Sequence, residues 1–222
     1  MGNRKVNFAL GEFYHIYNRG IDKRKIFTNE KDLSRFVKSI REFNSLEPIG
    51  SLYENSFKKD SLKNEDDKKN KLVNIACYAI NPNHFHLILE PLVEKGIEKF
   101  MQRLGTGYTM YFNEKYKRSG ALFQGVFKSV HINSNEYLVH LSAYINLNDR
   151  VHQLGGETSK LVKNSWNEYL TEKKFLIDDN SIILEQFNNL NEYKEFSLNT
   201  LSEIIERKNI LKEEQEENIY IE

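Results

Sequence analysis

The 222-residue sequence is poor in cysteine, proline and long apolar runs, with one cysteine and three prolines. A single cysteine, Cys77, cannot form a disulfide within the chain, and its apolar neighbours at 72–80 predict a buried thiol. No run of about 18 or more apolar residues is present, which argues against a membrane span. Residues 1–13 lack the apolar stretch of a signal peptide. These absences predict a cytoplasmic protein without a membrane partner.

Net charge is zero, but the charge is unevenly distributed along the chain. Residues 1–150 contain 24 Lys and Arg against 17 Asp and Glu, a net charge of +7, whereas residues 151–222 contain 8 against 15, a net of −7. A basic body followed by an acidic tail hints at a polyanionic partner for the body. A tail that is only a solvated helical appendage is compatible with the same numbers.

The hydrophobic pattern predicts seven elements before residue 150. Strands are expected at 72–80 and 84–92, a strand and a turn at 12–20, and a turn followed by a strand at 119–132. Helices are expected after the possible cap Asn29, at 97–116, and at 135–149 behind Asn133 or Ser134. The order is β-α-β-β-α-β-α, the split βαβ or ferredoxin-like pattern with one extra helix. The expected fold is therefore α+β, with an antiparallel sheet and a helical C-terminal appendage.

Two segments depart from this pattern. Residues from about 46 to 71 are mostly polar, rich in charge and nearly without periodicity, so a flexible insertion is expected there. After Gly155 and Gly156 the chain becomes acidic, with two or three probable helices. We expect a catalytic domain at 8–152 and an acidic, mostly helical extension at 156–222.

The stretch NPNHFHLILE, residues 81–90, places two histidines one residue apart in an apolar strand. Residues i and i+2 of a strand project from the same face, so His84 and His86 lie side by side. Two neutral imidazoles in this arrangement form a bidentate clamp for a metal ion. The alternative is a pair of partly exposed histidines at a sheet edge, because a His-x-His spacing is short enough to occur by chance.

Polar residues on the helix expected at 135–149 are candidates to complete this site. His140, Tyr144 and Asn148 follow at i, i+4 and i+8 and are predicted to share a helix face. A helix that only packs in the core would place Leu, Ile or Val there. An alternative for Tyr144 is a tyrosine at the edge of the core whose hydroxyl reaches water.

Four segments in this order resemble the single-tyrosine HUH transposases, in particular the bacterial REP-associated tyrosine transposases. They are YHIYNRGIDKR, NPNHFHLIL, GIEKFMQRLGTGYTMYFNEKYKRSGALFQGVFKS and EYLVHLSAYINLN, and together they span about residues 10–150. The resemblance implies a metal-dependent endonuclease and strand transferase that acts on single-stranded or hairpin DNA, as a monomer or homodimer.

Carried over from the resemblance, each site residue has an expected role. His84, His86 and Asn148 would bind Mg²⁺ or Mn²⁺, and Tyr144 would attack phosphorus to form a 5′-phosphotyrosine. Tyr137, two turns earlier, is the alternative nucleophile. Basic residues would contact DNA phosphates, and Tyr108, Tyr111 or Phe123 would stack on unpaired bases. The basic set is Arg19, Lys23, Arg24, Arg103, Lys115, Lys117, Arg118 and Lys128.

Two positions differ from the family pattern. Val126 stands where the family usually has Arg, and Asp149 stands where Pro often follows Asn148. The first change is expected to weaken a DNA contact and the second to shift the helix boundary. Alternative functions are a domesticated DNA hairpin-binding protein without turnover, a hydrolase in which water replaces Tyr144, and a general interaction domain.

Overall fold

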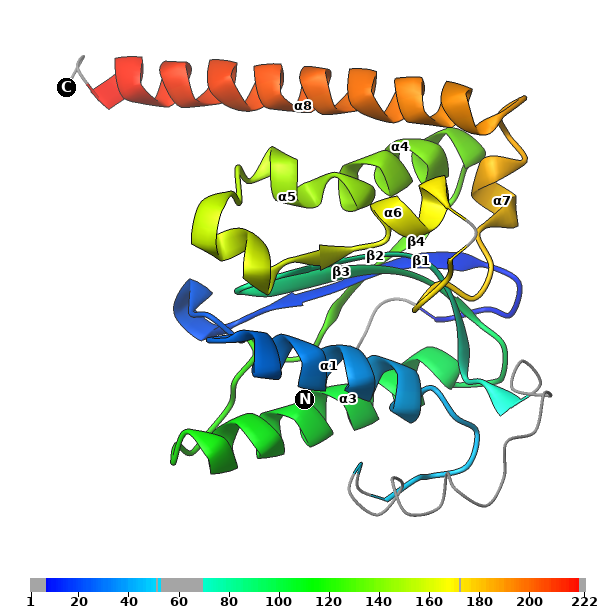
Figure 1. Cartoon of the computed structure of the whole chain (residues 1–222), viewed down its shortest axis with the longest axis vertical. Coiled ribbons are helices and arrows are strands. Elements are labelled where there is room, and N and C mark those ends of the chain that lie inside the picture. The colour runs from blue at the N-terminus through cyan, green and yellow to red at the C-terminus, as the bar shows by residue number, and fades with distance from the viewer. Residues whose placement is uncertain (1–6, 51, 53–69, 172, 220–222) are drawn as a thin grey trace.

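A five-stranded antiparallel sheet forms the centre of the molecule in the computed structural model, which describes residues 7–50, 52, 70–171 and 173–219 (Figure 1). The strand order is β4-β1-β3-β2-β5. The strands are β1 Phe13–Arg19, β2 Val73–Asn81, β3 His84–Pro91, β4 Lys128–Ile132 and β5 Lys163–Asn164. The first four strands confirm the ferredoxin-like prediction, and β5 extends the sheet beside β2.

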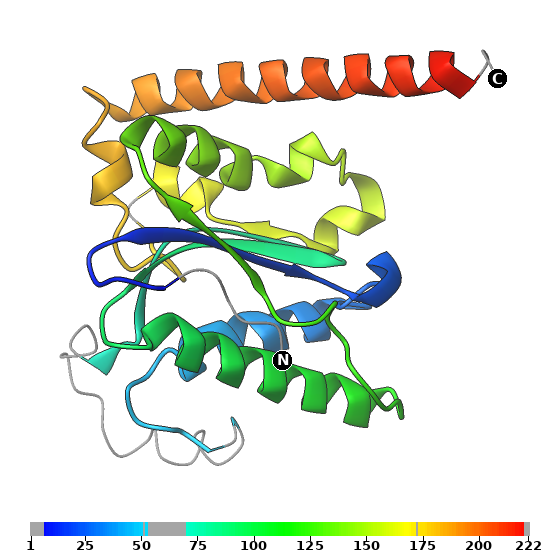
Figure 2. The ribbon, with the colours of Figure 1, turned by 180° about the vertical axis from the view of Figure 1, so that it is seen from behind.

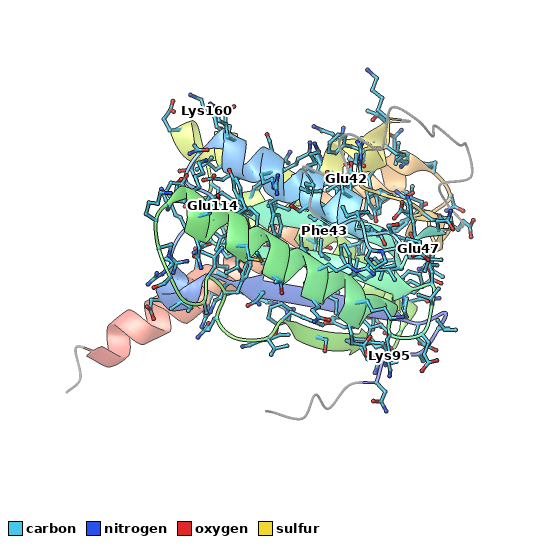
Figure 3. All side chains as sticks on the ribbon, turned by 90° about the horizontal axis from the view of Figure 1, so that it is seen from below. Glu42, Phe43, Glu47, Lys95, Glu114 and Lys160 are labelled. Atoms are coloured by element: carbon cyan, nitrogen blue, oxygen red, sulfur yellow. The ribbon has the colours of Figure 1, made fainter. Side chains whose placement is uncertain are left out.

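Two helices cover one face of the sheet. They are α1 Glu30–Phe43 and α3 Gly96–Lys115, which run side by side in Figure 3. The predicted cap of α1 is confirmed, since the Asn29 side chain accepts a hydrogen bond from the backbone N–H of Asp32. The two helices meet where the Phe43 ring packs over Gly107, so close that a Cβ at Gly107 would lie 2.7 Å from ring carbons.

The opposite face carries α4 Asn135–Asn146, α5 Asn148–Val151 and α6 Trp166–Leu170 (Figure 1). Of the two predicted caps of α4, Ser134 is the one used, because its hydroxyl accepts from the backbone N–H of Tyr137 at 3.1 Å. Short 3-10 segments lie at Ile21–Lys23 and Gly156–Leu161. The sheet is therefore enclosed between two helical layers.

The C-terminal segment builds a further layer over α4. It contains α7 Ser181–Leu184 and α8 Leu190–Ile219, and Figures 1 and 2 show α8 as the outermost helix, lying along α4. The helical character expected of this segment is confirmed. Its first part also enters the core: Ser165 accepts from the backbone N–H of Tyr78, and the Tyr169 hydroxyl donates to the carbonyl of Ala76. The domain division near residue 155 stays a prediction.

The turn and strand expected at 119–132 are both present: Gly120 and Gly125 adopt left-handed φ values of 84° and 71°, and β4 follows at Lys128–Ile132. One predicted boundary was wrong. The helix expected at 135–149 breaks at Leu147, whose φ and ψ are −111° and 20°, and α5 starts at Asn148. Most of the insertion expected at 46–71 lies outside the described residues.

The core confirms the apolar positions read from the sequence. Cys77 is fully buried, its Sγ lies 3.3 Å from Ser165 Oγ, and burial raises the pKa of its thiol to about 12. Leu138, Leu141 and Ile145 of α4 pack into the same core. Among the described residues, no helix is long and apolar enough to cross a bilayer.

Candidate active site

The candidate site is built on the sheet face that α4 covers. The register of the sheet pairs His84 with Arg19 and His86 with Tyr17, and it pairs Tyr17 with Lys128 on the other side of β1. Residues directly opposite each other in an antiparallel sheet project to the same face. Three strands therefore present imidazole, phenol and cationic groups on one surface.

His84 is held in one tautomer by its neighbour Asn83. The Asn83 amide donates to the carbonyl of Lys23 at 3.1 Å, which turns its Oδ1 toward His84 Nδ1 at 2.7 Å. Because that oxygen only accepts, Nδ1 of His84 carries the proton and Nε2 keeps its lone pair. The Nε2 atom faces the amides of Asn81 and Asn148, at 3.0 and 3.2 Å.

His86 lies between His84 and Tyr144. Its ring meets the His84 ring edge to face, with centroids 5.2 Å apart, and the Tyr144 ring in the same way at 5.8 Å. Its Nδ1 lies 2.8 Å from Nε2 of His15, a buried residue of β1. Strand spacing thus brings the two predicted histidines together, as expected.

Asn148 reaches the site from the first position of α5. Its side chain is fully buried, and its Oδ1 accepts from Asn81 Nδ2 at 2.5 Å. The sequence predicted that Asn148 would lie on the same helix as Tyr144. The break at Leu147 places it on α5 instead. The amide nevertheless arrives beside His84, so the expected grouping of His84, His86, Tyr144 and Asn148 is present.

Tyr144 is half-buried and borders a cavity of about 580 Å³ above these histidines. The described residues that line this cavity include Arg19, Lys23 and Lys128 but no Asp or Glu. A cavity lined by cations without carboxylates attracts anions. The remaining lining residues are Tyr17, Asn18, Asn83, His84, His86, Gln124, His152 and Leu154.

Burial keeps the imidazoles neutral. Burial lowers the pKa of His86 to about 2, and electrostatic repulsion from His15, His84 and His152 acts in the same direction. Burial also lowers the pKa of His84, although the hydrogen bond with Asn148 acts in the opposite direction. It also lowers the pKa of His152 to about 4. A neutral imidazole is the form that binds metal ions, so near neutral pH no proton has to leave before a cation enters.

The residues fit a divalent cation. His84 Nε2 and Asn148 Oδ1 are both acceptors, lie 3.2 Å apart and share the Asn81 amide as their donor, so a cation could take the place of that donor. Two imidazoles and an amide oxygen leave room for phosphate or water oxygens, which suits Mg²⁺ or Mn²⁺. Within the described part of the chain, no three His, Cys, Asp or Glu side chains converge as a metal cluster.

Three residues at the site were missed by the sequence reading. His15 and Asn81 reach it through sheet register, and the His152 ring meets the His84 ring with centroids 5.0 Å apart. YHIYN does place His15 and Tyr17 at the i and i+2 positions of a strand, the signal that identified His84 and His86. His152 had no such signal, because it follows a helix break.

The predicted DNA contacts divide into two groups. Arg19, Lys23 and Lys128 line the cavity. Arg103 instead donates to the carbonyls of Ser45 and Leu46, and Lys115 forms an ion pair with the buried Asp32. The remaining three residues also lie outside the cavity lining. Arg24 forms an ion pair with Asp22, Arg118 donates a hydrogen bond to Asn113, and Lys117 has a left-handed backbone conformation.

Two aromatic predictions and one helix prediction were wrong. Tyr108 is fully buried and its hydroxyl donates to the carbonyl of Ile26, so its ring is closed to a base. Phe123 is also buried. His140 is exposed beside α8, where its ring packs against Phe196 with centroids 4.8 Å apart, instead of joining Tyr144. Tyr111 is partly buried and donates to Asp32 Oδ1 at 3.0 Å.

Comparison with known proteins gives one family match and a small number of similar solved structures. Residues 54–148 match the family model described as IS200-like transposases. The solved structures similar to this chain include a REP-associated tyrosine transposase bound to a REP hairpin, with 12% identity and a TM-score of 0.48. That match covers 81% of this chain and 95% of the other. No curated protein matches the sequence. The chain is thus similar to the IS200-like transposase family over residues 54–148, which contain His84, His86, Tyr144 and Asn148.

Proposed function

We propose that this protein cleaves and rejoins single-stranded DNA beside hairpins, as REP-associated tyrosine transposases are expected to do, through a 5′-phosphotyrosine on Tyr144. The observation that carries the proposal is the position of Tyr144. Its ring lies 5.8 Å from that of His86 in a cavity lined by cations and free of carboxylates in its described lining. The similarity of residues 54–148 to the IS200-like transposase family supports a transposase activity in general terms.

The chemistry assigned to the chain is a phosphoryl transfer to a phenol. The Tyr144 oxygen attacks phosphorus, the bond from phosphorus to the 3′ oxygen breaks, and that oxygen takes a proton from water as a 3′-hydroxyl. The phenol proton leaves to solvent through the open cavity. The bond energy is conserved in the phosphotyrosine, so a second 3′-hydroxyl can reverse the step and join strands without ATP.

The residues around Tyr144 bind and orient the phosphate. Arg19, Lys23 and Lys128 would neutralise the backbone on either side of the scissile bond. His84, His86 and Asn148 would hold the divalent ion. When bound, such an ion withdraws charge from the non-bridging phosphate oxygens. With these charges neutralised, the half-buried Tyr144 phenol would approach the phosphorus atom against less repulsion from the phosphate oxygens.

A second candidate is a hairpin-binding protein without turnover. The observation that favours it is Val126, which is 70% exposed at a position where the family usually has Arg. A weakened contact there could reduce cleavage of a target that is still bound. Simple binding, however, requires none of the four grouped residues.

A covalent-trapping experiment separates these functions. Labelled single-stranded hairpin DNA from the repeats that flank the gene is incubated with the protein and Mn²⁺ or EDTA, and a denaturing gel detects protein–DNA adducts. We expect an adduct that requires Mn²⁺, is lost in Tyr144→Phe, and persists in Tyr137→Phe. Tyr137 is the matched control because it lies on the same helix but does not line the cavity.

Each other outcome contradicts part of the proposal. Cleavage without an adduct would transfer the chemistry to a water molecule. Binding without cleavage would support the hairpin-binding function. An adduct that persists in Tyr144→Phe but is lost in Tyr137→Phe would make Tyr137 the nucleophile.

A further inference from the structure

His15 is a buried histidine that contacts a proposed metal ligand directly. Its Nε2 lies 2.8 Å from His86 Nδ1, and the two rings are stacked with centroids 5.1 Å apart. The side chain is 8% exposed and also stacks on Tyr17 at 4.8 Å. Two imidazole nitrogens at hydrogen-bond distance share one proton, so one of them donates and the other accepts.

The direction of this hydrogen bond decides what His86 offers to the cavity. If His15 donates, His86 Nδ1 accepts, and a neutral His86 then carries its proton on Nε2, where it cannot ligate a cation. If His86 Nδ1 donates, its Nε2 has a free lone pair. Of the two nitrogens of His86, Nδ1 is occupied by His15, so Nε2 is the nitrogen left for the cavity that this residue lines.

We propose that His15 is a positioning residue that accepts the Nδ1 proton of His86 and so directs the Nε2 lone pair of His86 into the cavity. The inference rests on the proposed function, since it concerns the proposed metal site. A histidine that ligates a metal almost always donates its other N–H to a partner that fixes its tautomer. His15 supplies that partner here with a neutral ring nitrogen.

His84, the neighbouring histidine, also has a hydrogen-bond acceptor at its Nδ1, supplied by a different residue. His84 Nδ1 donates to Asn83 Oδ1 at 2.7 Å, and the Asn83 amide is itself fixed by the carbonyl of Lys23. Both members of the His-x-His pair therefore have an acceptor at Nδ1, one from the turn that precedes β3 and one from the adjacent β1. The two Nε2 lone pairs can then serve one cation together.

The tautomer can be measured in the metal-free protein. Long-range ¹H–¹⁵N spectra of ¹⁵N-histidine-labelled protein, with His86 assigned by its loss in His86→Gln, report which ring nitrogen carries the proton. We expect the Nδ1–H form in the wild type and a mixture of both forms in His15→Leu. In His15→Gln the amide oxygen replaces Nε2 as the acceptor, and the Nδ1–H form should return.

Metal affinity gives a second readout. Titration followed by the electron paramagnetic resonance signal of free Mn²⁺ should show affinity about 10- to 100-fold weaker in His15→Leu, with recovery in His15→Gln. His140→Leu is the matched control, because that exposed histidine packs beside α8 and does not line the cavity. Circular dichroism melting of each variant confirms that it is folded.

The outcomes distinguish this inference from the proposed function. A wild-type His86 with its proton on Nε2, or a folded His15→Leu with unchanged tautomer, would overturn the role of His15. Unchanged Mn²⁺ affinity in folded His15→Leu would overturn it as well. A wild type that binds no Mn²⁺ but keeps the Nδ1–H form would remove the metal from the proposed function and support the tautomer assignment.

Discussion

Asp32 shows how a single buried charge is stabilised away from the active site. Its carboxylate accepts from Thr28 Oγ1 and the Tyr116 hydroxyl, each at 2.7 Å, and pairs with Lys115. Burial alone would raise its pKa, but hydrogen bonds from Lys115, Tyr116 and Thr28 lower the pKa from its ordinary value of 3.8 to about 2. The folded state thus binds the ionised form more strongly than the unfolded chain does.

A pH dependence of stability follows from this lowered pKa. The contribution of Asp32 is complete above the unfolded pKa of 3.8 and is lost as the pH falls toward about 2. It amounts to roughly 2 kcal/mol. Urea unfolding of wild type and Asp32→Asn between pH 6 and pH 2.5 should show the variant less stable at pH 6, with the difference shrinking on acidification. A difference that is constant across this range would contradict the assignment.

Asn148 provides a direct test of the proposed metal site. Asn148→Asp places a carboxylate beside His84 Nε2, and Mg²⁺ and Mn²⁺ bind carboxylates more strongly than amides. We expect Mn²⁺ to bind about tenfold more tightly to Asn148→Asp, and more weakly to Asn148→Leu, in a calorimetric titration. Equal affinity in wild type, Asn148→Asp and Asn148→Leu would exclude Asn148 from the site.

Sequence reasoning at the residue scale succeeded where one element carries both partners. His84 and His86 were identified because strand geometry alone places them side by side. His15, Asn81 and His152 were missed because their contacts depend on which strands are neighbours, on the register between them and on the break at Leu147. None of these is encoded in a local spacing.

At the scale of elements, α3 contains two glycines that the sequence could only mark as weak helix formers. Gly105 has open space around its Cα, whereas a Cβ at Gly107 would meet the Phe43 ring of α1 at 2.7 Å. Two positions that look equivalent in the sequence thus have different roles. Gly107 permits the close approach of α1 and α3, and Gly105 does not contribute to it.

Alanine substitution should separate these two roles. Gly105→Ala should raise the free energy of unfolding by up to about 1 kcal/mol, because alanine favours the helix. Gly107→Ala should lower it by about 1 kcal/mol, because displacement of Phe43 outweighs the same gain. Chemical unfolding of both variants measures the contrast. Equal stabilisation by the two substitutions would contradict the close packing.

The order of the elements was predictable from periodicity, but the end of one helix was not. The turn and strand expected at 119–132 are present, with the left-handed Gly120 and Gly125 before β4. The helix was predicted to continue from 135 through Leu147 to 149, because nothing in its apolar spacing marks a stop. Backbone geometry imposed by the packing of α5 decides that end.

At the scale of the whole molecule, Tyr193 joins the C-terminal helices to α4. The side chain is fully buried, and its hydroxyl lies 2.8 Å from Asn146 Nδ2 and 3.1 Å from Ser142 Oγ. Its ring stacks on Tyr169 with centroids 5.2 Å apart. These contacts show that the C-terminal segment packs on α4 and is more than a solvated appendage.

Substitutions at Tyr193 should lower the free energy of unfolding by an amount that depends on how much of the side chain is removed. Tyr193→Ala should reduce the free energy of unfolding by about 3–5 kcal/mol through the cavity it leaves. Tyr193→Phe should cost about 1–2 kcal/mol, because the Asn146 amide loses its acceptor. Ile210→Ala, at an exposed position of the same helix, should change it by less than about 0.5 kcal/mol. Urea titrations measure all three, and a stable Tyr193→Ala would show that the tail packs loosely.

The small strand β5 and the residues after it have a consequence for how the protein is made. They pair with β2 and cover Tyr78 and Cys77, although they are synthesised more than 80 residues later. A nascent chain that has emerged only as far as α5 already contains Tyr144 and the histidines but leaves this side of β2 open. The residues of the candidate site are thus translated first, and the sheet that holds them is completed only when the C-terminal segment leaves the ribosome.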